Sequence, residues 1–169
     1  GVRLVCHSGE DRLANEKFVP AVAKTWLGYS PPVSLTDGFP ILIACQASLD
    51  ELNRQLREQG KGVVPMSRFR PNIVIQGTKP FEEDMWKTVK IGDQLFSIVK
   101  ACPRCKQSCT DQETGEVSAE PVAIMKTFRA LGENGDDVYF AQNALALGRG
   151  TVDVNAPVQV LERGDPVYC

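Results

Sequence analysis

The sequence contains a single histidine, His7, and this scarcity limits the chemistry open to the protein. Sites built from several imidazoles are excluded, and a histidine-based catalytic triad could form only around His7. No apolar run approaches the roughly 20 residues that a membrane helix needs, and no signal peptide opens the chain. A formal charge of −2, without a basic stripe interleaved with aromatic residues, gives no case for nucleic acid. We therefore expect a cytoplasmic protein with neither a membrane nor a nucleic acid as partner.

The chain also lacks internal repeats, low-complexity segments and a glycine-rich phosphate loop. With 169 residues it has the size of one domain and can bury about two-thirds of its unfolded surface. Its apolar and charged contents are those of an ordinary globular protein. We expect residues 1–169 to form a single domain.

The cysteines do not follow the pattern of a disulfide framework, because no secretory signal indicates an oxidising compartment. Cys6 and Cys45 fall inside apolar strand-like runs, where a free thiol packs as a small hydrophobe. The six positions are Cys6, Cys45, Cys102, Cys105, Cys109 and Cys169.

Residues 99–111 carry three of these thiols and three cationic side chains, directly after a strand-like run. Cys105 stands between Arg104 and Lys106, and adjacent positive charge favours the thiolate form of a cysteine. A thiolate is both a nucleophile and a soft metal ligand, so we expect the chemistry of the protein here. The alternative is that Cys102 and Cys109 are ordinary part-buried thiols and the arginine is solvated.

Three other chemistries fit the spacing C-x-x-C-x-x-x-C less well. A structural zinc site needs four ligands and normally a second cysteine pair. The spacings of plant-type and bacterial iron–sulfur proteins are absent. A redox couple of Cys102 and Cys105 lacks a thioredoxin-like βαβ pattern around it.

Short apolar or alternating runs predict a sheet of many strands, of which the clearest is a hairpin of 86–91 and 94–99 around Gly92 and Asp93. A strand that follows Pro71 should lie at an edge, since proline removes a ladder donor. The other expected strands are 2–6, 41–45, 73–77, 138–141, 144–147, 151–154 and 158–161. Many short strands with two or three helices predict a mainly β domain with a few helices (α+β), resembling a β-barrel.

The clearest helix is expected over residues 48–59, where leucines recur on one face. Ser48 and Glu51 form a capping box at its start, and Gly60 stands where a C-terminal glycine belongs. Helical spacing also covers residues 121–131.

Two polar segments are predicted to lie on the surface. Residues 7–34 are irregular and indicate a long loop, which in a compact domain is usually functional or mobile. Residues 79–86 carry a run of carboxylates with no histidine or cysteine nearby in the sequence, so we expect that run to be solvated.

Arg68 and Arg70 precede the strand over 73–77. In an extended chain, side chains at i and i+2 point to the same side. Two arginines at the mouth of a strand suit a phosphate or carboxylate ligand, because guanidinium groups bind oxyanions through paired donors. Simple solvent exposure of both side chains is the alternative.

Several sequence blocks, taken in order, resemble the MOSC domain family. The resemblance is closest to its reductases, bacterial relatives of the mitochondrial amidoxime-reducing component, and to the C-terminal domain of molybdenum-cofactor sulfurase. The blocks are residues 36–40 (TDGFP) with 46–53 (QASLDELN), 68–74 (RFRPNIV), 102–105 (CPRC) with 111–115 (DQETG), 140–143 (FAQN) and 164–167 (GDPV).

The resemblance implies a MOSC-type β-barrel domain that binds the molybdenum cofactor, a pterin with a dithiolene and a phosphate. By the same resemblance, Cys105 is the protein ligand to molybdenum. Arg70, Asn72 and Arg104 would hold the pterin and its phosphate. Asp37 would lie close to the metal, as an orienting group or proton donor, although a turn-forming role alone fits it equally well.

The reaction implied is reduction of an N-hydroxylated compound by oxygen-atom transfer at molybdenum, with electrons from an iron–sulfur protein or domain. The alternative is a sulfur-carrier or cofactor-delivery module, in which Cys105 carries a persulfide for a cysteine desulfurase. A third possibility is a structural domain without a cofactor. The resemblance also implies pyridoxal phosphate binding at the level of the family.

The sequence departs from the family in several places. Nothing in residues 1–33 is long enough to be the N-terminal β-rich portion of the family's reductases, and the cysteine spacing of a C-terminal ferredoxin-like domain is absent. Ala141 stands where the family has glycine, and Cys109 where it has threonine or a hydrophobic residue. We therefore expect an isolated MOSC domain whose activity as a molybdenum-dependent oxidoreductase needs further domains or an electron donor.

Overall fold

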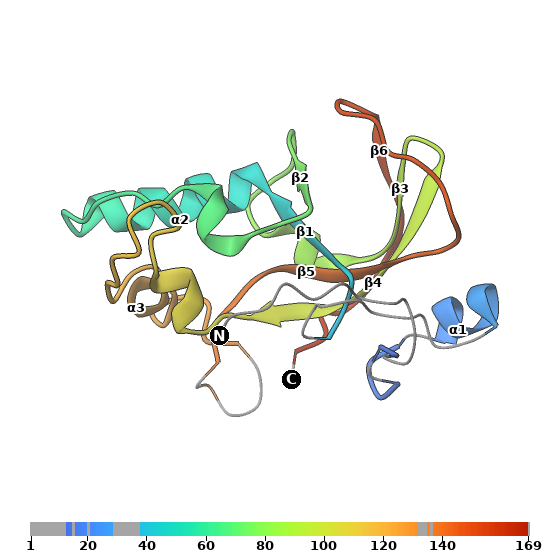
Figure 1. Ribbon diagram of the computed structural model, residues 1–169, viewed down its shortest axis with the longest axis horizontal. Coiled ribbons are helices and arrows are strands. Elements are labelled where there is room, and N and C mark those ends of the chain that lie inside the picture. The colour runs from blue at the N-terminus through green and yellow to red at the C-terminus, as the bar shows by residue number, and fades with distance from the viewer. Residues whose placement is uncertain are drawn as a thin grey trace, which may run out of the picture.

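The fold is a six-stranded, curled sheet with a few short helices, as the sequence predicts (Figure 1). The computed structural model describes residues 13–14, 16–19, 21–28, 38–131, 135 and 137–168. The strands are β1 (Ile41–Cys45), β2 (Ile73–Ile75), β3 (Trp86–Ile91), β4 (Gln94–Pro103), β5 (Tyr139–Ala146) and β6 (Val158–Arg163). The helices are α1 (Ala21–Leu27), α2 (Gln46–Glu58) and α3 (Val122–Met125), with 3-10 turns η1 (Met66–Phe69), η2 (Glu82–Met85) and η3 (Lys106–Cys109).

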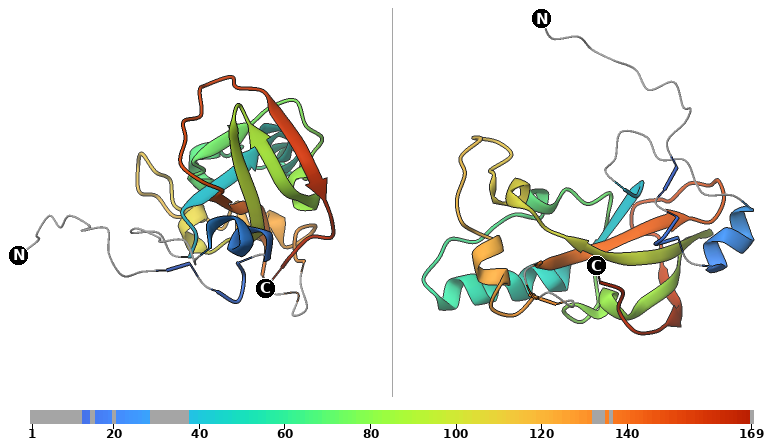
Figure 2. Two further views of the ribbon diagram at one scale, coloured as in Figure 1. Left: turned by 90° about the vertical axis from the view of Figure 1, so that its right-hand side faces the viewer. Right: turned by 90° about the horizontal axis from the view of Figure 1, so that it is seen from below.

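The strands follow the order β2-β1-β5-β4-β3-β6 across the sheet. β1 and β2 pair in parallel, and the other neighbouring pairs are antiparallel. The expected hairpin of β3 and β4 is confirmed, with Gly92 at a φ of 57° in its turn. The expected edge position of β2 is confirmed too. Two views show α2 and α3 at one end of the sheet and α1 at the other (Figures 1 and 2).

Helix α2 confirms the expected leucine face but not the expected start. The helix begins at Gln46, with Cys45 as its N-cap residue. The Ser48 hydroxyl forms no cap; it lies 2.7 Å from a carboxyl oxygen of Glu83 and accepts the Phe81 N–H at 2.8 Å. The capping-box prediction was therefore wrong. The end of the helix is as expected, since Gly60 has a φ of 68°.

Other expectations need correction. The segment 7–34 contains α1, and the helix expected over 121–131 is only Val122–Met125, because the chain turns away there and delivers Arg129 to the core. Residues 151–154 form no strand, and the runs 138–141 and 144–147 belong largely to one strand, β5. The expected strand 2–6 lies outside the described residues, as do Cys6, His7, Asp37 and Cys169.

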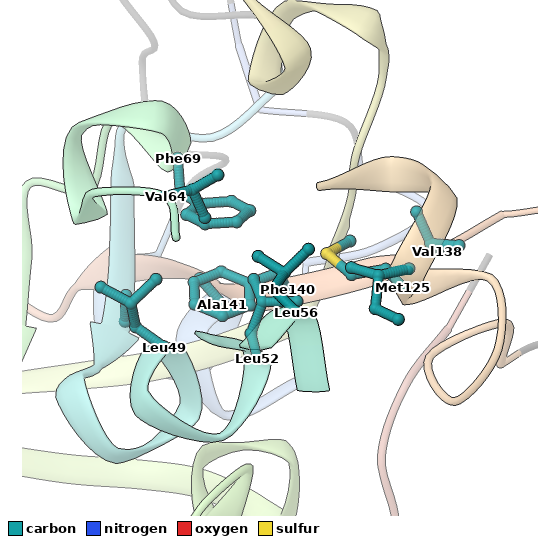
Figure 3. Close-up of a cluster of buried hydrophobic side chains, with 11 residues drawn as sticks. Leu49, Leu52, Leu56, Val64, Phe69, Met125, Val138, Phe140 and Ala141 are labelled. Atoms are coloured by element: carbon teal, nitrogen blue, oxygen red, sulfur yellow. The ribbon is translucent and has the colours of Figure 1, made fainter. Parts of the chain in front are cut away.

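One hydrophobic cluster connects α2 to the middle of the sheet and to the loop after α2. Figure 3 shows Leu52 and Leu56 of α2 packed with Phe69 of η1 and Phe140 of β5. The Phe69 and Phe140 rings stack with their centroids 3.9 Å apart. This stacking ties η1 to the core, and with it the arginines on either side of Phe69.

The carboxylate run of residues 79–86 is not solvated, and this expectation was wrong. Glu83 is fully buried, and Asp84 is 7% exposed. The Asp84 carboxylate accepts hydrogen bonds from Arg129 Nη1 at 2.7 Å, Arg129 Nη2 at 3.1 Å and Gln142 Nε2 at 2.8 Å. These partners compensate the loss of hydration that a buried charge suffers.

Glu83 predicts a specific pH dependence of folding. Burial raises the pKa of Glu83, and the neighbouring Asp84 charge raises it further. The folded chain therefore binds this proton more tightly than the unfolded chain. The contribution of this proton to the free energy of unfolding is fully present below the ordinary glutamate pKa of about 4.3. It is lost as the pH rises toward the pKa of Glu83 in the folded chain. Replacing Glu83 with glutamine should remove this decline and raise the stability at pH 7 relative to that at pH 4.5.

Urea denaturation of both chains between pH 4.5 and 8 measures this effect. Glu82→Gln is the matched control. Hydrogen bonds from the Lys79 backbone N–H and Arg163 lower the pKa of Glu82, so the ionisation of Glu82 changes stability only at a pH below the measured range. Parallel stability profiles for the wild type and Glu83→Gln would contradict the prediction.

None of the helices in the described part of the chain combines the length and the apolar character needed to cross a membrane.

Candidate functional site

Strand β4 ends in the cysteine-rich segment, and the next turn, η3, fixes the backbone of Cys105. Ser108 donates both its N–H, at 3.1 Å, and its hydroxyl, at 2.9 Å, to the Cys105 carbonyl. The Cys105 side chain is exposed and free. Cys102 is half-buried and Cys109 is buried, also as free thiols. Among these three thiols, Cys105 is therefore the most accessible to a ligand from solvent.

Arg104 joins the two loops that carry the arginine and cysteine motifs. Its Nη2 donates to the Phe69 carbonyl at 3.0 Å, and its Nη1 donates to Cys102 Sγ at 3.0 Å. The guanidinium carbon also lies 5.4 Å from the centroid of the Phe69 ring. The backbone N–H of Arg104 donates to the Val138 carbonyl at 2.8 Å. The positive charge next to Cys105 is thus held in a defined place.

Arg68 and Arg70 do not point to one side of an extended strand, and that expectation was wrong. Arg68 belongs to the 3-10 turn η1, and Arg70 follows it with a left-handed φ of 55°. This backbone region is disfavoured for residues with a Cβ and is often found at functional sites. Arg70 is exposed, whereas Arg68 is half-buried and pairs with Asp111 at 2.9 Å.

Asn72 acts as a clamp between two strands. Its Oδ1 accepts the Leu42 N–H at 2.8 Å, and its own N–H donates to the Leu42 carbonyl at 2.9 Å. These bonds lie beside the β1–β2 register, in which Ile43 pairs with Ile73. The structure therefore gives the side-chain oxygen of Asn72 a part in holding β2 and the Arg70 turn against β1.

Asp111 was not singled out from the sequence as a site residue. Its Oδ1 accepts the N–H groups of Glu113 at 2.9 Å and Thr114 at 3.0 Å, and these bonds hold the pKa of Asp111 below its usual value. The remaining oxygen pairs with Arg68. The DQETG block after the cysteines is thereby locked to η1, and only the three-dimensional structure shows this contact.

The sequence-predicted residues Cys105, Arg104, Arg70 and Asn72 thus lie on adjoining segments, with Arg104 as the direct link. Asp37, the remaining predicted residue, lies outside the described residues. Within the described residues there is no group of three or more histidine, cysteine, aspartate and glutamate side chains that could hold a metal ion.

Comparison with known proteins supports one family. The MOSC domain family matches residues 30–168. The chain is 31% identical over 158 residues to mitochondrial amidoxime reducing component 2 of Bos taurus, covering 93% of this chain and 43% of that protein. It is 35% identical over 135 residues to mitochondrial amidoxime-reducing component 1 of Homo sapiens, covering 76% of this chain and 39% of that protein.

A third relative is molybdenum cofactor sulfurase of Botryotinia fuckeliana. The identity is 35% over 105 residues, which cover 58% of this chain and 13% of the sulfurase. The chain spans less than half the length of each of these three relatives. The extent of the family match, from residue 30 to residue 168, shows that the chain belongs to the MOSC domain family.

Proposed function

We propose that this domain binds the molybdenum cofactor through Cys105 and serves in the reduction of N-hydroxylated compounds. The observation that carries the proposal is the exposed Cys105 thiol beside Arg104, whose guanidinium is fixed to the Phe69 carbonyl. The names of the relatives support it: two are amidoxime-reducing components and one is a molybdenum cofactor sulfurase.

The residues present fit such a cofactor. A thiolate is a soft metal ligand, and the free, exposed Cys105 thiol can take that role. Arg104 Nε is buried and has no hydrogen-bond partner among the described residues, as expected where an oxygen-rich group is to be bound. When bound, the cofactor would supply two-electron oxygen-atom transfer.

The chain's own residues would bind the cofactor and orient it. Cys105 would hold the metal, and Arg104, Arg70 and Asn72 would hold the pterin and phosphate. The fixed guanidinium of Arg104 would stabilise negative charge beside the thiolate without reorganisation during the reaction. Asp37 would be an orienting group or proton donor near the metal.

Electrons would come from an iron–sulfur protein or domain. A cytoplasmic location is part of the proposal, and two of the relatives are named as mitochondrial. The whole protein's substrate range remains part of this proposal, since the matched region is less than half of those relatives.

Expression in a host that makes the cofactor tests the proposal. Molybdenum should be measured by elemental analysis and pterin by fluorescence after oxidation, each per chain. We expect near-stoichiometric amounts of both, and reduction of an amidoxime when a reduced iron–sulfur protein is added. Purified chain with neither molybdenum nor pterin would contradict the proposal.

The second candidate is a sulfur carrier, favoured by the exposure of Cys105 and by the sulfurase relative. In that case Cys105 would accept one sulfur atom from a cysteine desulfurase. Intact mass spectrometry would then show one additional sulfur on Cys105 in chain that holds no molybdenum.

A further inference from the structure

An apolar cavity of about 380 Å³ opens beside the start of β4. Its walls come from β1, β2, β4, β5 and the segment that follows β5. The apolar side chains in these walls are Ile41, Ile73, Phe96, Ala146 and Val152. Ligand cavities in proteins are mostly apolar and hold roughly 300–1,000 Å³. This cavity therefore has the size and the lining of a site for a small molecule.

Arg149 lies on the wall between this cavity and an adjoining one, on a loop whose two glycines fix its backbone. Gly148 has a φ of 112°, a conformation that residues with a Cβ rarely adopt. A Cβ on Gly150 would lie 2.3 Å from Gln94 Oε1, so the loop approaches β4 more closely than any other residue allows. The Arg149 side chain is exposed and forms no hydrogen bond or ion pair with the described residues. Its paired donors are thus free for a ligand.

Gln94 supplies a second polar group with an unused position. The residue is only 8% exposed, and it lines both cavities. Its Nε2 donates to the Leu95 carbonyl at 3.0 Å, whereas its Oε1 accepts no hydrogen bond within the described ranges. Buried amide oxygens normally have a donor. The Gln94 oxygen therefore indicates a ligand that brings an O–H or N–H group.

We infer that this cavity binds a small apolar carboxylic acid that also carries an O–H or N–H donor. The planar carboxylate suits the fork of Arg149, the donor suits Gln94 Oε1, and the apolar body packs on Phe96 and its neighbours. A doubly charged phosphate fits less well. Arg149 is the one cationic side chain among the described residues that line the two cavities, and Asp153 lines the adjoining cavity.

The cavity is remote from Cys105, so this inference does not rest on the proposed function. Gln94 and Pro103 are the first and last of the ten residues of β4, which at the rise of a strand are about 30 Å apart. Figure 1 shows the β3–β4 turn and the segment after β5 at the end of the sheet away from α2 and α3. Of the described residues proposed for the cofactor, only Asn72 lines the cavity, and its Oδ1 is occupied by the Leu42 N–H.

Three related compounds test the inference by titration into the purified chain, followed by calorimetry and by saturation-transfer NMR of the ligand. Phenyllactate has the apolar ring, the carboxylate and the hydroxyl donor, and we expect it to bind with at most a millimolar dissociation constant. Phenylpropanoate lacks the hydroxyl and should bind about threefold to tenfold more weakly, the usual loss for one hydrogen bond. Phenylpropanediol lacks the carboxylate and should bind about tenfold more weakly or worse, because a charge-assisted pair is lost.

Variants assign these differences to single side chains. Arg149→Gln should bind phenyllactate about tenfold more weakly and leave phenylpropanediol unaffected. Gln94→Leu should reduce the affinity for phenyllactate to that for phenylpropanoate. Arg57→Gln, at an exposed arginine of α2 without a described side-chain partner, is the matched control and should bind as wild type does. Cys105→Ser should also bind as wild type does, because Cys105 lies far from the cavity.

Absence of phenyllactate binding to the wild type at millimolar concentration would overturn the inference. Equal affinity of the wild type and Arg149→Gln for phenyllactate would overturn it too. A loss in Cys105→Ser as large as that in Arg149→Gln would place the acid at the cysteine segment and reject the cavity. Arg149 is exposed, so its replacement should leave the melting temperature unchanged, and melts of all variants establish that each is folded.

Discussion

Replacement of Arg129 by alanine is expected to lower the free energy of unfolding by about 3–5 kcal/mol. The Arg129 and Asp84 side chains are only 6% and 9% exposed, and they form a bidentate pair. Without the guanidinium, Asp84 keeps Gln142 as a partner but loses the compensating charge. Arg129 Nε also donates to the Tyr139 carbonyl at 2.9 Å, so that acceptor loses a partner as well.

Urea denaturation of the wild type and Arg129→Ala gives the difference by linear extrapolation. Arg54→Ala is the control for loss of an ion pair on the surface, since Arg54 is 50% exposed. There we expect a change of about 1 kcal/mol or less. A loss of the same small size for Arg129→Ala would show that the buried pair contributes no more than an exposed one.

This buried pair also supports the functional site. Tyr139, which accepts from Arg129, pairs with Pro103 at the end of β4. The next residue, Arg104, donates its backbone N–H to Val138. The end of β4, which leads to Cys105, and the start of β5 are therefore connected to the hydrogen-bond network that neutralises Asp84. We expect substitutions there to affect cofactor retention as well as stability.

Local patterns predict the parts of this fold that local interactions determine. The β3–β4 hairpin follows from alternating residues around Gly92, and the leucine face of α2 from its spacing. The burial of Asp84 could not be predicted in this way, because its partners lie 45 and 58 residues further along the chain. A run of carboxylates has the same local sequence whether or not a distant arginine packs against it.

The candidate site shows the same division. The arginines of residues 68–74 and the cysteines of residues 102–109 are visible as motifs, but their connection is not. Arg104 reaches the Phe69 carbonyl across 35 positions, and Arg68 reaches Asp111 across 43. The 3-10 conformation of η1 decides which arginine is buried, and it depends on Phe69 stacking on Phe140, a tertiary contact.

Cys105→Ser is expected to reduce bound molybdenum by at least about tenfold in chain expressed with the cofactor. A serine hydroxyl does not ionise near neutral pH and is a hard oxygen ligand, whereas the thiolate is a soft one. Because Cys105 is exposed, the substitution should leave the melting temperature nearly unchanged. Elemental analysis and a thermal melt on the same preparation measure both effects.

Two other thiols provide the comparison that assigns the ligand. Cys109→Ser alters a buried thiol whose Sγ lies 3.5 Å from the Ala119 carbonyl, so it should act on stability and leave molybdenum bound. Cys102→Ser keeps an acceptor for Arg104 Nη1 and should cause at most a partial loss of metal. Equal molybdenum in wild type and Cys105→Ser would exclude Cys105 as the ligand. A large loss of molybdenum in Cys102→Ser alone would instead assign the metal to Cys102, because substitution of the ligand thiol releases the metal.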